Sequence, residues 1–272
     1  SWNIGLGLSL GYTWHLPIGR IGSGAGYNFV KTWVDYNDNI YRPYNETIRE
    51  NFNTWMTTNQ LWASVSWDTR DYVYNPNKGF YLKETLTYTG GILPSDREYI
   101  SSTTKGQIFQ QLFSIPLGET FKFKAVLALG SSISVILNQL DDEIKVTTNE
   151  LLYIDGLTMA RGWDRVYDGK VLWDNWVELR LPIFDRYIWW DFFMTATGIW
   201  PEREMFKDMT SEDFYCTLGG GFRLTIPGLP IGFYFVKRFQ YANHGDIDWQ
   251  EGTLFKNSMK LDFVVGFNQS YY

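Results

Sequence analysis

The segment Trp2-Asn-Ile-Gly-Leu-Gly-Leu-Ser-Leu-Gly-Tyr-Thr-Trp14 alternates large apolar residues with small or polar ones. Successive side chains of a β-strand point to opposite faces, so this period of two predicts a strand with one apolar face and one small, polar face. The same alternation returns in residues 121–130, 173–181, 214–226 and 259–267. The chain is therefore predicted to be all-β.

The composition agrees with this prediction. Of 272 residues, 18% are aromatic and 25 are glycine, a mixture that favours strands and tight turns over helices. No run of about 18 consecutive apolar residues occurs, which excludes a membrane-spanning helix. The first residues also lack the basic and apolar segments of a signal peptide.

Residues that carry enzyme and metal chemistry are scarce. Cys216 is the single cysteine, which forbids an internal disulfide and a thiolate metal cluster, and His15 and His244 are the two histidines. Neither histidine has a serine and an acid placed around it by local spacing, and no phosphate-binding loop appears. The net charge of −6 offers no basic surface for nucleic acid. We predict a protein that is not an enzyme, with no metal, cofactor or nucleic-acid partner.

One apolar and one polar face would also suit a soluble β-sandwich. Two features favour a transmembrane β-barrel instead. The strands approach the roughly 9 to 11 residues that cross a bilayer at a tilt. Tryptophan and tyrosine gather at strand ends, where interfacial girdles lie; the residues concerned are Tyr12, Trp14, Trp33, Tyr36, Trp55, Trp189, Trp190 and Trp200.

The predicted connections alternate between short and long, as in outer-membrane barrels with short periplasmic turns and long extracellular loops. Short turns fall near residues 16–19, 74–78, 117–120, 184–186 and 227–230, and long polar loops cover 37–54, 91–97, 138–172, 202–213 and 240–257. This pattern predicts eleven strands. An odd number cannot close an ordinary antiparallel barrel with both ends in the periplasm, so we expect either a count wrong by one or further strands on the N-terminal side.

Three motifs follow one another along the chain. In the longest loop Gly156 precedes Ala160-Arg161-Gly162-Trp163, and the strand Trp176-Val-Glu-Leu-Arg-Leu-Pro182 comes next. Trp67-Asp-Thr-Arg-Asp71 stands before Asn75-Pro-Asn-Lys-Gly79. The third motif is the order of the closing segments: a Phe-Phe strand that ends at Gly198-Ile-Trp200, a glycine-rich strand, the turn Pro227-Gly-Leu-Pro230, and a last strand that ends at Gly266-Phe267.

Together, the motifs resemble the BamA family of outer-membrane protein assembly barrels. The resemblance implies an antiparallel transmembrane β-barrel of sixteen strands preceded by periplasmic POTRA domains. Aligned on the Arg161 loop, residues 1–272 would be the C-terminal part of that barrel domain, beginning at its sixth strand. The first five strands and the POTRA domains would then be absent from this chain.

The resemblance also implies a role for the loop motif. Ala160, Arg161, Gly162 and Trp163 would fold into the barrel lumen, and lumen-facing acids would hold Arg161. A charge-assisted contact can offset the ordering entropy of so long a loop. Glu178 matches one family acid and lies on the polar face of its strand. The second family acid falls at Thr195, and Asp191, on the same face, is expected to replace it.

Two further sites follow from the resemblance. Asp68, Arg70 and Asp71 would fix a periplasmic turn and its strand packing, although a plain rim of charges explains them equally well. The last strand, with Phe263, Gly266 and Phe267, would form one side of a loosely paired seam that templates incoming strands. Gly266 would weaken the pairing, or would simply fit a tight barrel interior.

The predicted function is insertion and folding of β-barrel proteins into the bacterial outer membrane, by strand templating and membrane thinning. Its partners would be unfolded outer-membrane protein clients, accessory assembly lipoproteins and outer-membrane lipid. Two alternatives stay open: a polypeptide-secretion barrel of the same superfamily, and a diffusion porin.

Overall fold

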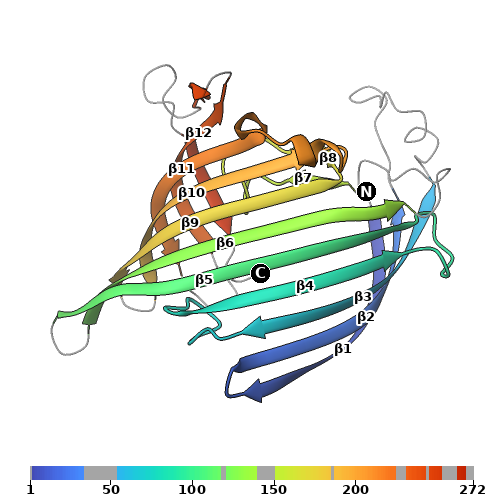
Figure 1. Cartoon of the computed structure of the whole chain (residues 1–272), viewed down its shortest axis with the longest axis horizontal. Coiled ribbons are helices and arrows are strands. Elements are labelled where there is room, and N and C mark those ends of the chain that lie inside the picture. The colour runs from blue at the N-terminus through green and yellow to red at the C-terminus, as the bar shows by residue number, and fades with distance from the viewer. Residues whose placement is uncertain are drawn as a thin grey trace. The chain divides into compact units, whose positions relative to one another are not determined.

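The computed structural model describes residues 2–33, 54–117, 121–139, 151–184, 187–224, 231–242, 245–252 and 262–267. Among these residues, no helix is long and apolar enough to cross a membrane. Nearly all the regular structure belongs to one antiparallel sheet in which neighbouring strands follow the chain order (Figure 1). Its strands are β1 (Trp2–Leu16), β2 (Gly19–Trp33), β3 (Trp55–Asp68), β4 (Gly79–Thr89), β5 (Tyr99–Leu117), β6 (Phe121–Gln139), β9 (Val171–Phe184), β10 (Ile188–Trp200), β11 (Phe214–Leu224) and β12 (Ile231–Tyr241).

Two strands pair with β12 along the edge opposite β11. The short β13 (Ile247–Trp249) pairs with Phe239–Tyr241, and β14 (Asp262–Phe267) pairs with Ile231–Val236. The eleven predicted strands correspond to β1 to β6, β9 to β12 and β14, so the all-β prediction is confirmed. The predicted start of the last strand at residue 259 lies outside the described residues.

Four short elements and β13 were not predicted from the sequence. The strands β7 (Leu152–Ile154) and β8 (Val166–Gly169) pair as a hairpin inside the longest loop. Two single-turn 3₁₀ helices, η1 (Met205–Asp208) and η2 (Ser211–Asp213), lie between β10 and β11. All are too short to leave a periodic signal in the sequence.

The two faces of the sheet differ as the alternation predicts. On β9 and β10 one face carries buried polar residues, among them Asp174, Glu178, Arg180, Asp191 and Thr195. The other face exposes large apolar side chains, as a surface against lipid requires; on β10, β11, β12 and β14 these include Phe192, Leu218, Phe222, Phe233, Phe235, Phe263 and Val265.

The prediction that aromatic residues at strand ends lie at the membrane interface is wrong for Trp189 and Trp200. Trp189 is 1% exposed and lies beneath the Arg223 guanidinium, 5.6 Å from its ring centroid. Trp200 is also buried, with its ring packed edge-on against Phe206 and Phe214. A position near a strand end is therefore not enough to tell a tryptophan at the membrane interface from one whose ring is buried in the protein. Tyr36 lies outside the described residues.

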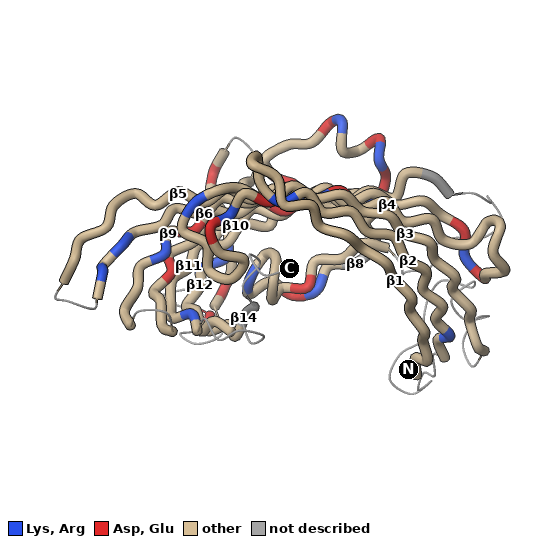
Figure 2. The backbone as a smooth tube through the Cα atoms, turned by 90° about the horizontal axis from the view of Figure 1, so that it is seen from below, with Lys and Arg blue, Asp and Glu red and all other residues tan. Residues whose placement is uncertain are grey.

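The chain divides into two compact units. The first contains residues 1–67, 83–104 and 134–151, and holds β1, β2 and most of β3. The second contains residues 68–82, 105–133 and 152–272, and holds β7 to β14. The charged positions of the second unit recur along β9, β10 and β11 (Figure 2).

Candidate functional site

The tip of the longest loop, residues 155–163, is a turn closed by hydrogen bonds among its own residues. The carboxylate of Asp155 accepts hydrogen bonds from the backbone N–H groups of Leu157, Thr158 and Met159, at 2.9 to 3.1 Å. The backbone N–H of Gly162 donates to the carbonyl of Gly156 at 2.8 Å. Gly156 has φ +70°, and a Cβ there would collide with the carbonyl oxygen of Trp163, so this position requires glycine.

Arg161 at the tip is fully buried and pairs with Glu178 of β9. Its Nη2 donates to Glu178 Oε1 at 2.7 Å. The other carboxylate oxygen, Oε2, accepts hydrogen bonds from Arg180 Nε at 3.0 Å and Nη2 at 2.8 Å. One buried carboxylate therefore serves two buried guanidinium groups, and removal of Glu178 would leave both without this partner.

The guanidinium of Arg161 also lies on an aromatic platform formed by Phe193 and Tyr234. Its Cζ is 4.3 Å from the Phe193 ring centroid and 5.0 Å from that of Tyr234, and the two rings meet edge to face. A desolvated cation over an aromatic face is stabilised by the ring quadrupole. Gly219 of β11 leaves room for this platform, because a Cβ there would lie 2.5 Å from Phe193 Cζ.

The rest of the tip contacts the last strands of the sheet, β11, β12 and β14. Thr217 Oγ1 on β11 donates to the Arg161 carbonyl at 3.0 Å, and Trp163 Nε1 donates to the Cys216 carbonyl at 3.1 Å. A Cβ on Gly162 would lie 2.8 Å from Val236 Cγ2 of β12 and 3.3 Å from Val264 Cγ2 of β14. The tip thus contacts β9, β10, β11, β12 and β14, and Ala160 brings it there with a left-handed φ of +45°.

The predicted contact of Asp191 with Arg161 is wrong. Both carboxylate oxygens of Asp191 instead accept hydrogen bonds from Arg223 on β11, at 2.5 and 3.1 Å. Arg223 Nη1 also donates to Asn75 Oδ1, in the turn between β3 and β4, at 3.0 Å. The reason is register: Arg180 and Gly221 are the cross-strand neighbours of Asp191, whereas Phe193 is the neighbour of Glu178. Asp191 therefore lies one inward-facing position further along the strand than the Arg161 contact requires.

Thr195, at the position of the second family acid, does not supply a carboxylate. Its Oγ1 is buried and, among the described residues, accepts or donates no hydrogen bond. The same holds for Nε and Nη1 of Arg161. In the described structure Arg161 is thus held by one carboxylate and two aromatic rings.

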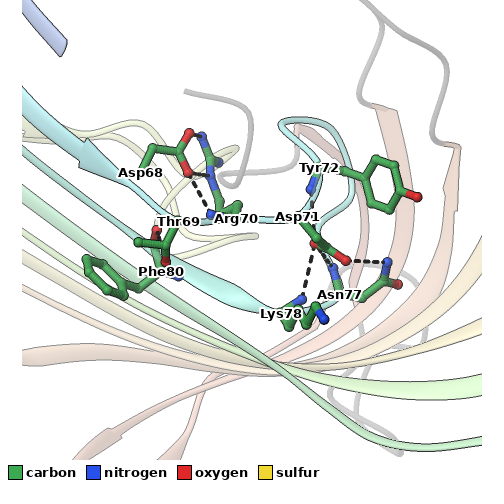
Figure 3. Close-up of polar contacts among 8 residues, drawn as sticks. All are labelled: Asp68, Thr69, Arg70, Asp71, Tyr72, Asn77, Lys78 and Phe80. Atoms are coloured by element: carbon green, nitrogen blue, oxygen red, sulfur yellow. Dashed lines mark hydrogen bonds and ion pairs between the residues drawn. The ribbon is translucent and has the colours of Figure 1, made fainter. Parts of the chain in front are cut away.

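The second predicted motif builds the turn between β3 and β4 (Figure 3). Arg70 donates to both carboxylate oxygens of Asp68 at 2.9 Å, and its guanidinium lies 4.4 Å from the Tyr81 ring centroid. Asp71 Oδ1 accepts hydrogen bonds from the backbone N–H groups of Tyr72, Asn77 and Lys78, and Oδ2 accepts one from Asn77 Nδ2.

Asp71 therefore caps the turn that it opens. Partial burial raises the pKa of its carboxyl, but the hydrogen bonds from Asn77, Lys78 and Tyr72 outweigh burial and lower the pKa below its ordinary value. The three residues of this motif meet around one turn, and each has a direct partner there.

The predicted seam residues lie on β14. Phe263 is exposed on the outward face, where its ring contacts those of Phe233 and Phe235 on β12. Gly266 pairs with Gly232, and Phe267 with Ile231. The pairing is supported by an ion pair that the sequence did not indicate, Arg238 Nε to Asp262 Oδ2 at 2.9 Å.

Several residues of this site were missed by sequence reasoning. Phe193, Thr217, Tyr234 and Arg238 all share the inward face, which the alternation does reveal, but only the fold shows that the loop tip reaches them. Within the described ranges, no group of three or more His, Cys, Asp or Glu residues could hold a metal ion. The arrangement is a clamp that positions a loop against strands.

An antiparallel sheet with an apolar outward face, and a long loop held on the opposite face by a buried arginine, define an outer-membrane β-barrel with an inward-folded loop. The chain belongs to the Omp85 superfamily, because the family model described as "Omp85 superfamily domain" matches residues 2–266.

Two known proteins support the assignment. Over 292 aligned residues the chain is 26% identical to a "Putative outer membrane protein assembly factor" of Treponema pallidum (strain Nichols), covering 96% of this chain and 34% of that relative. The chain thus spans about a third of the relative it matches. Its fold is similar to the crystal structure of BamA from Haemophilus ducreyi lacking POTRA domains 1–3, with a TM-score of 0.56, 16% identity, and coverage of 91% of this chain and 52% of that chain. The predicted resemblance to BamA-type barrels and the outer-membrane localisation are confirmed.

Proposed function

We propose that this chain is part of the barrel domain of a protein that inserts and folds other β-barrel proteins into the outer membrane, without catalysis or nucleotide. The observation that carries the proposal is the loop tip, whose Arg161, Gly162 and Trp163 contact the last strands of the sheet all at once. Membership of the Omp85 superfamily and the name of the Treponema relative support the same function. The remaining barrel strands and POTRA domains would lie in other parts of the protein.

In the proposed mechanism the last strand is the working edge. β14 is six residues long, and within the described residues it pairs with β12 alone. An exposed strand edge offers unpaired N–H and C=O groups, which an incoming client strand can use as a template. The opposed pair Gly232 and Gly266 has no side chains to pack across the strands, so pairing there is weak and exchange is easier.

The driving force would come from the client. Unfolded strands in or near lipid carry unpaired backbone groups, and pairing them into a closed barrel lowers their free energy. The protein would lower the barrier by offering an edge and by thinning the nearby bilayer. Its partners would be unfolded outer-membrane protein clients, accessory assembly lipoproteins and lipid.

The loop clamp would set the position of this edge. Because Gly162 packs on Val236 and Val264, the tip braces β12 and β14 from the inward face. Release of Arg161 from Glu178 would remove that brace. The reciprocal exchange of the two charges is a poor test, because Glu178→Arg would place a second guanidinium beside Arg180.

The sharper experiment introduces Arg161→Glu into the full-length protein in its own cells. We expect clients to accumulate unfolded in the periplasm while the variant itself still reaches the membrane folded, because the introduced carboxylate would face that of Glu178 and expel the tip. The matched control is Arg203→Glu, on an exposed loop.

Other outcomes would point elsewhere. Normal client assembly with loss of one exported polypeptide would favour a secretion barrel. High sugar or ion flux through the purified, unmodified protein in vesicles would favour a diffusion porin.

A further inference from the structure

We propose that an apolar groove on the outward face of β1 to β5 holds an acyl chain of an outer-membrane lipid. The groove lies wholly within the first compact unit and has a volume of about 900 Å³. It is distinct from the loop clamp, with which it shares no residue, and it does not depend on the proposed function.

The lining residues place the groove on the outward face. They recur at every second position on consecutive strands: Leu8 and Leu10 on β1, Ala25 on β2, Leu61 and Ala63 on β3, and Leu86 on β4. Side chains two residues apart on a strand share one face. Gly24 and Gly26 belong to the opposite face, where they lie against Trp62 and Ser64.

The shape of the groove follows from side-chain size. Ala25 is the cross-strand neighbour of Leu10, and Tyr27 that of Leu8, so the small Ala25 lies in a row of larger groups. Ala63 provides a second small side chain on β3. Two alanines among leucines and tyrosines make a low floor between taller walls, which suits a linear methylene chain.

The chemistry of the surroundings identifies the occupant. Leu8, Leu10 and Leu86 are 65%, 86% and 49% exposed, and on β1 to β3 this face continues into the apolar band that an outer-membrane barrel turns toward lipid. The lining polar residues Ser9 and Thr87 fall in the opposite phase of the alternation, so their side chains belong to the other face. A groove lined by apolar and aromatic side chains, opening onto the lipid-facing surface, fits an acyl chain rather than a polar ligand.

Packing contacts, and not the hydrophobic effect, would retain the acyl chain in the groove. Lipid tails are as apolar as leucine, so moving an acyl chain from bulk lipid into the groove gains no burial from water. The gain is the sum of many small dispersion contacts with the groove walls. We therefore expect preferential occupancy in exchange with other lipids.

The test uses the full-length protein in nanodiscs of phosphatidylethanolamine and phosphatidylglycerol that contain a phospholipid with a mid-chain diazirine. After irradiation, mass spectrometry locates the crosslinks. We expect them to concentrate on peptides carrying Leu8–Leu10, Leu61–Ala63 and Leu86, above other outward leucines such as Leu112 and Leu218.

Filling the groove should remove this preference. The double variant Ala25→Leu with Ala63→Leu should lower crosslinking at these peptides roughly threefold, since it excludes several dispersion contacts. Ser23→Leu adds similar bulk to the outward face of β2 at a position that does not line the groove, and should leave the yield unchanged. If the double variant fails to fold, the single variant Ala25→Val serves instead.

Even crosslinking over all outward leucines, or a yield unaffected by filling, would overturn the proposal in favour of ordinary annular lipid. Crosslinks absent from the groove while other outward leucines react would overturn it in favour of a protein segment covering this face.

Discussion

The Arg161 loop tip and the turn between β3 and β4 use the same chemistry in different surroundings. In each, an arginine binds a carboxylate and lies over an aromatic ring: Arg161 on Glu178 and Phe193, Arg70 on Asp68 and Tyr81. Arg161 and Glu178 are almost inaccessible, whereas the side chain of Asp68 is 13% exposed. Water can partly replace the partner of Arg70 but not that of Arg161, so the same pairing should contribute differently to stability.

The largest expected effect is that of Glu178→Ala. The substitution removes the carboxylate that Arg161 and Arg180 share, and should lower the free energy of unfolding by about 3–5 kcal/mol. Asp68→Ala, the matching change in the turn, should cost about 1–2 kcal/mol. Urea unfolding of both variants in lipid vesicles measures the difference, and equal losses would contradict the role given to burial.

The second-largest loss of stability is expected from a change in the aromatic platform of Phe193 and Tyr234. Phe193→Leu keeps an apolar side chain but removes the ring beneath Arg161, and should cost about 2 kcal/mol in the same assay. Phe192→Leu is the control, since Phe192 is the adjacent residue and lies on the exposed outward face. A Phe192 variant as unstable as the Phe193 variant would show that ring packing in general, and not the cation, is responsible.

Gly162→Ala tests how closely the tip approaches the last strands. The substitution strains a φ of +92° and pushes a Cβ against Val236, so we expect a loss of about 2 kcal/mol. Gly245→Ala strains a similar φ of +86° with nothing within 4 Å, and should cost about 1 kcal/mol. Equal costs would mean that backbone strain alone explains the Gly162 variant.

The smallest effect concerns pH and the turn. Because the pKa of Asp71 is lowered in the folded protein, its capping contribution is present above the ordinary carboxyl pKa and is lost as the pH falls through the lower, folded value. Hydrogen exchange at the amides of Asn77 and Lys78 should therefore lose protection in the range below about pH 4. In Asp71→Asn this pH dependence should disappear, since the amide does not titrate; a profile identical to that of the unmodified protein would exclude Asp71 as its cause.

Sequence reasoning was most reliable where the cause is local. Alternation revealed the strands and the inward direction of Glu178, because side-chain direction depends only on position along a strand. Arg70 and Asp68 are two residues apart, so their contact needs no knowledge of the rest of the chain. The turn capped by Asp71 is local in the same sense.

The same reasoning was wrong where register decides. Asp191 shares a face with Thr195, yet cross-strand pairing sets it beside Arg180, and its direct ion pair in the described structure is with Arg223 and not with Arg161. Trp189, near a strand end, is buried under Arg223. Alternation cannot show how far one strand slides along its neighbour, since a shift by two residues keeps every side chain on its face.

By itself, then, the sequence determined the antiparallel sheet, the apolar face turned to lipid and the inward position of the acid that pairs with Arg161. These follow from the period of two and from the chemistry of single residues. Only the tertiary structure decided which partners meet: Phe193 and Tyr234 beneath Arg161, and Val264 of the last strand against Gly162. Such contacts depend on strand register and on the path of a long loop, which arise from the packing of distant segments and leave no periodic trace in the chain.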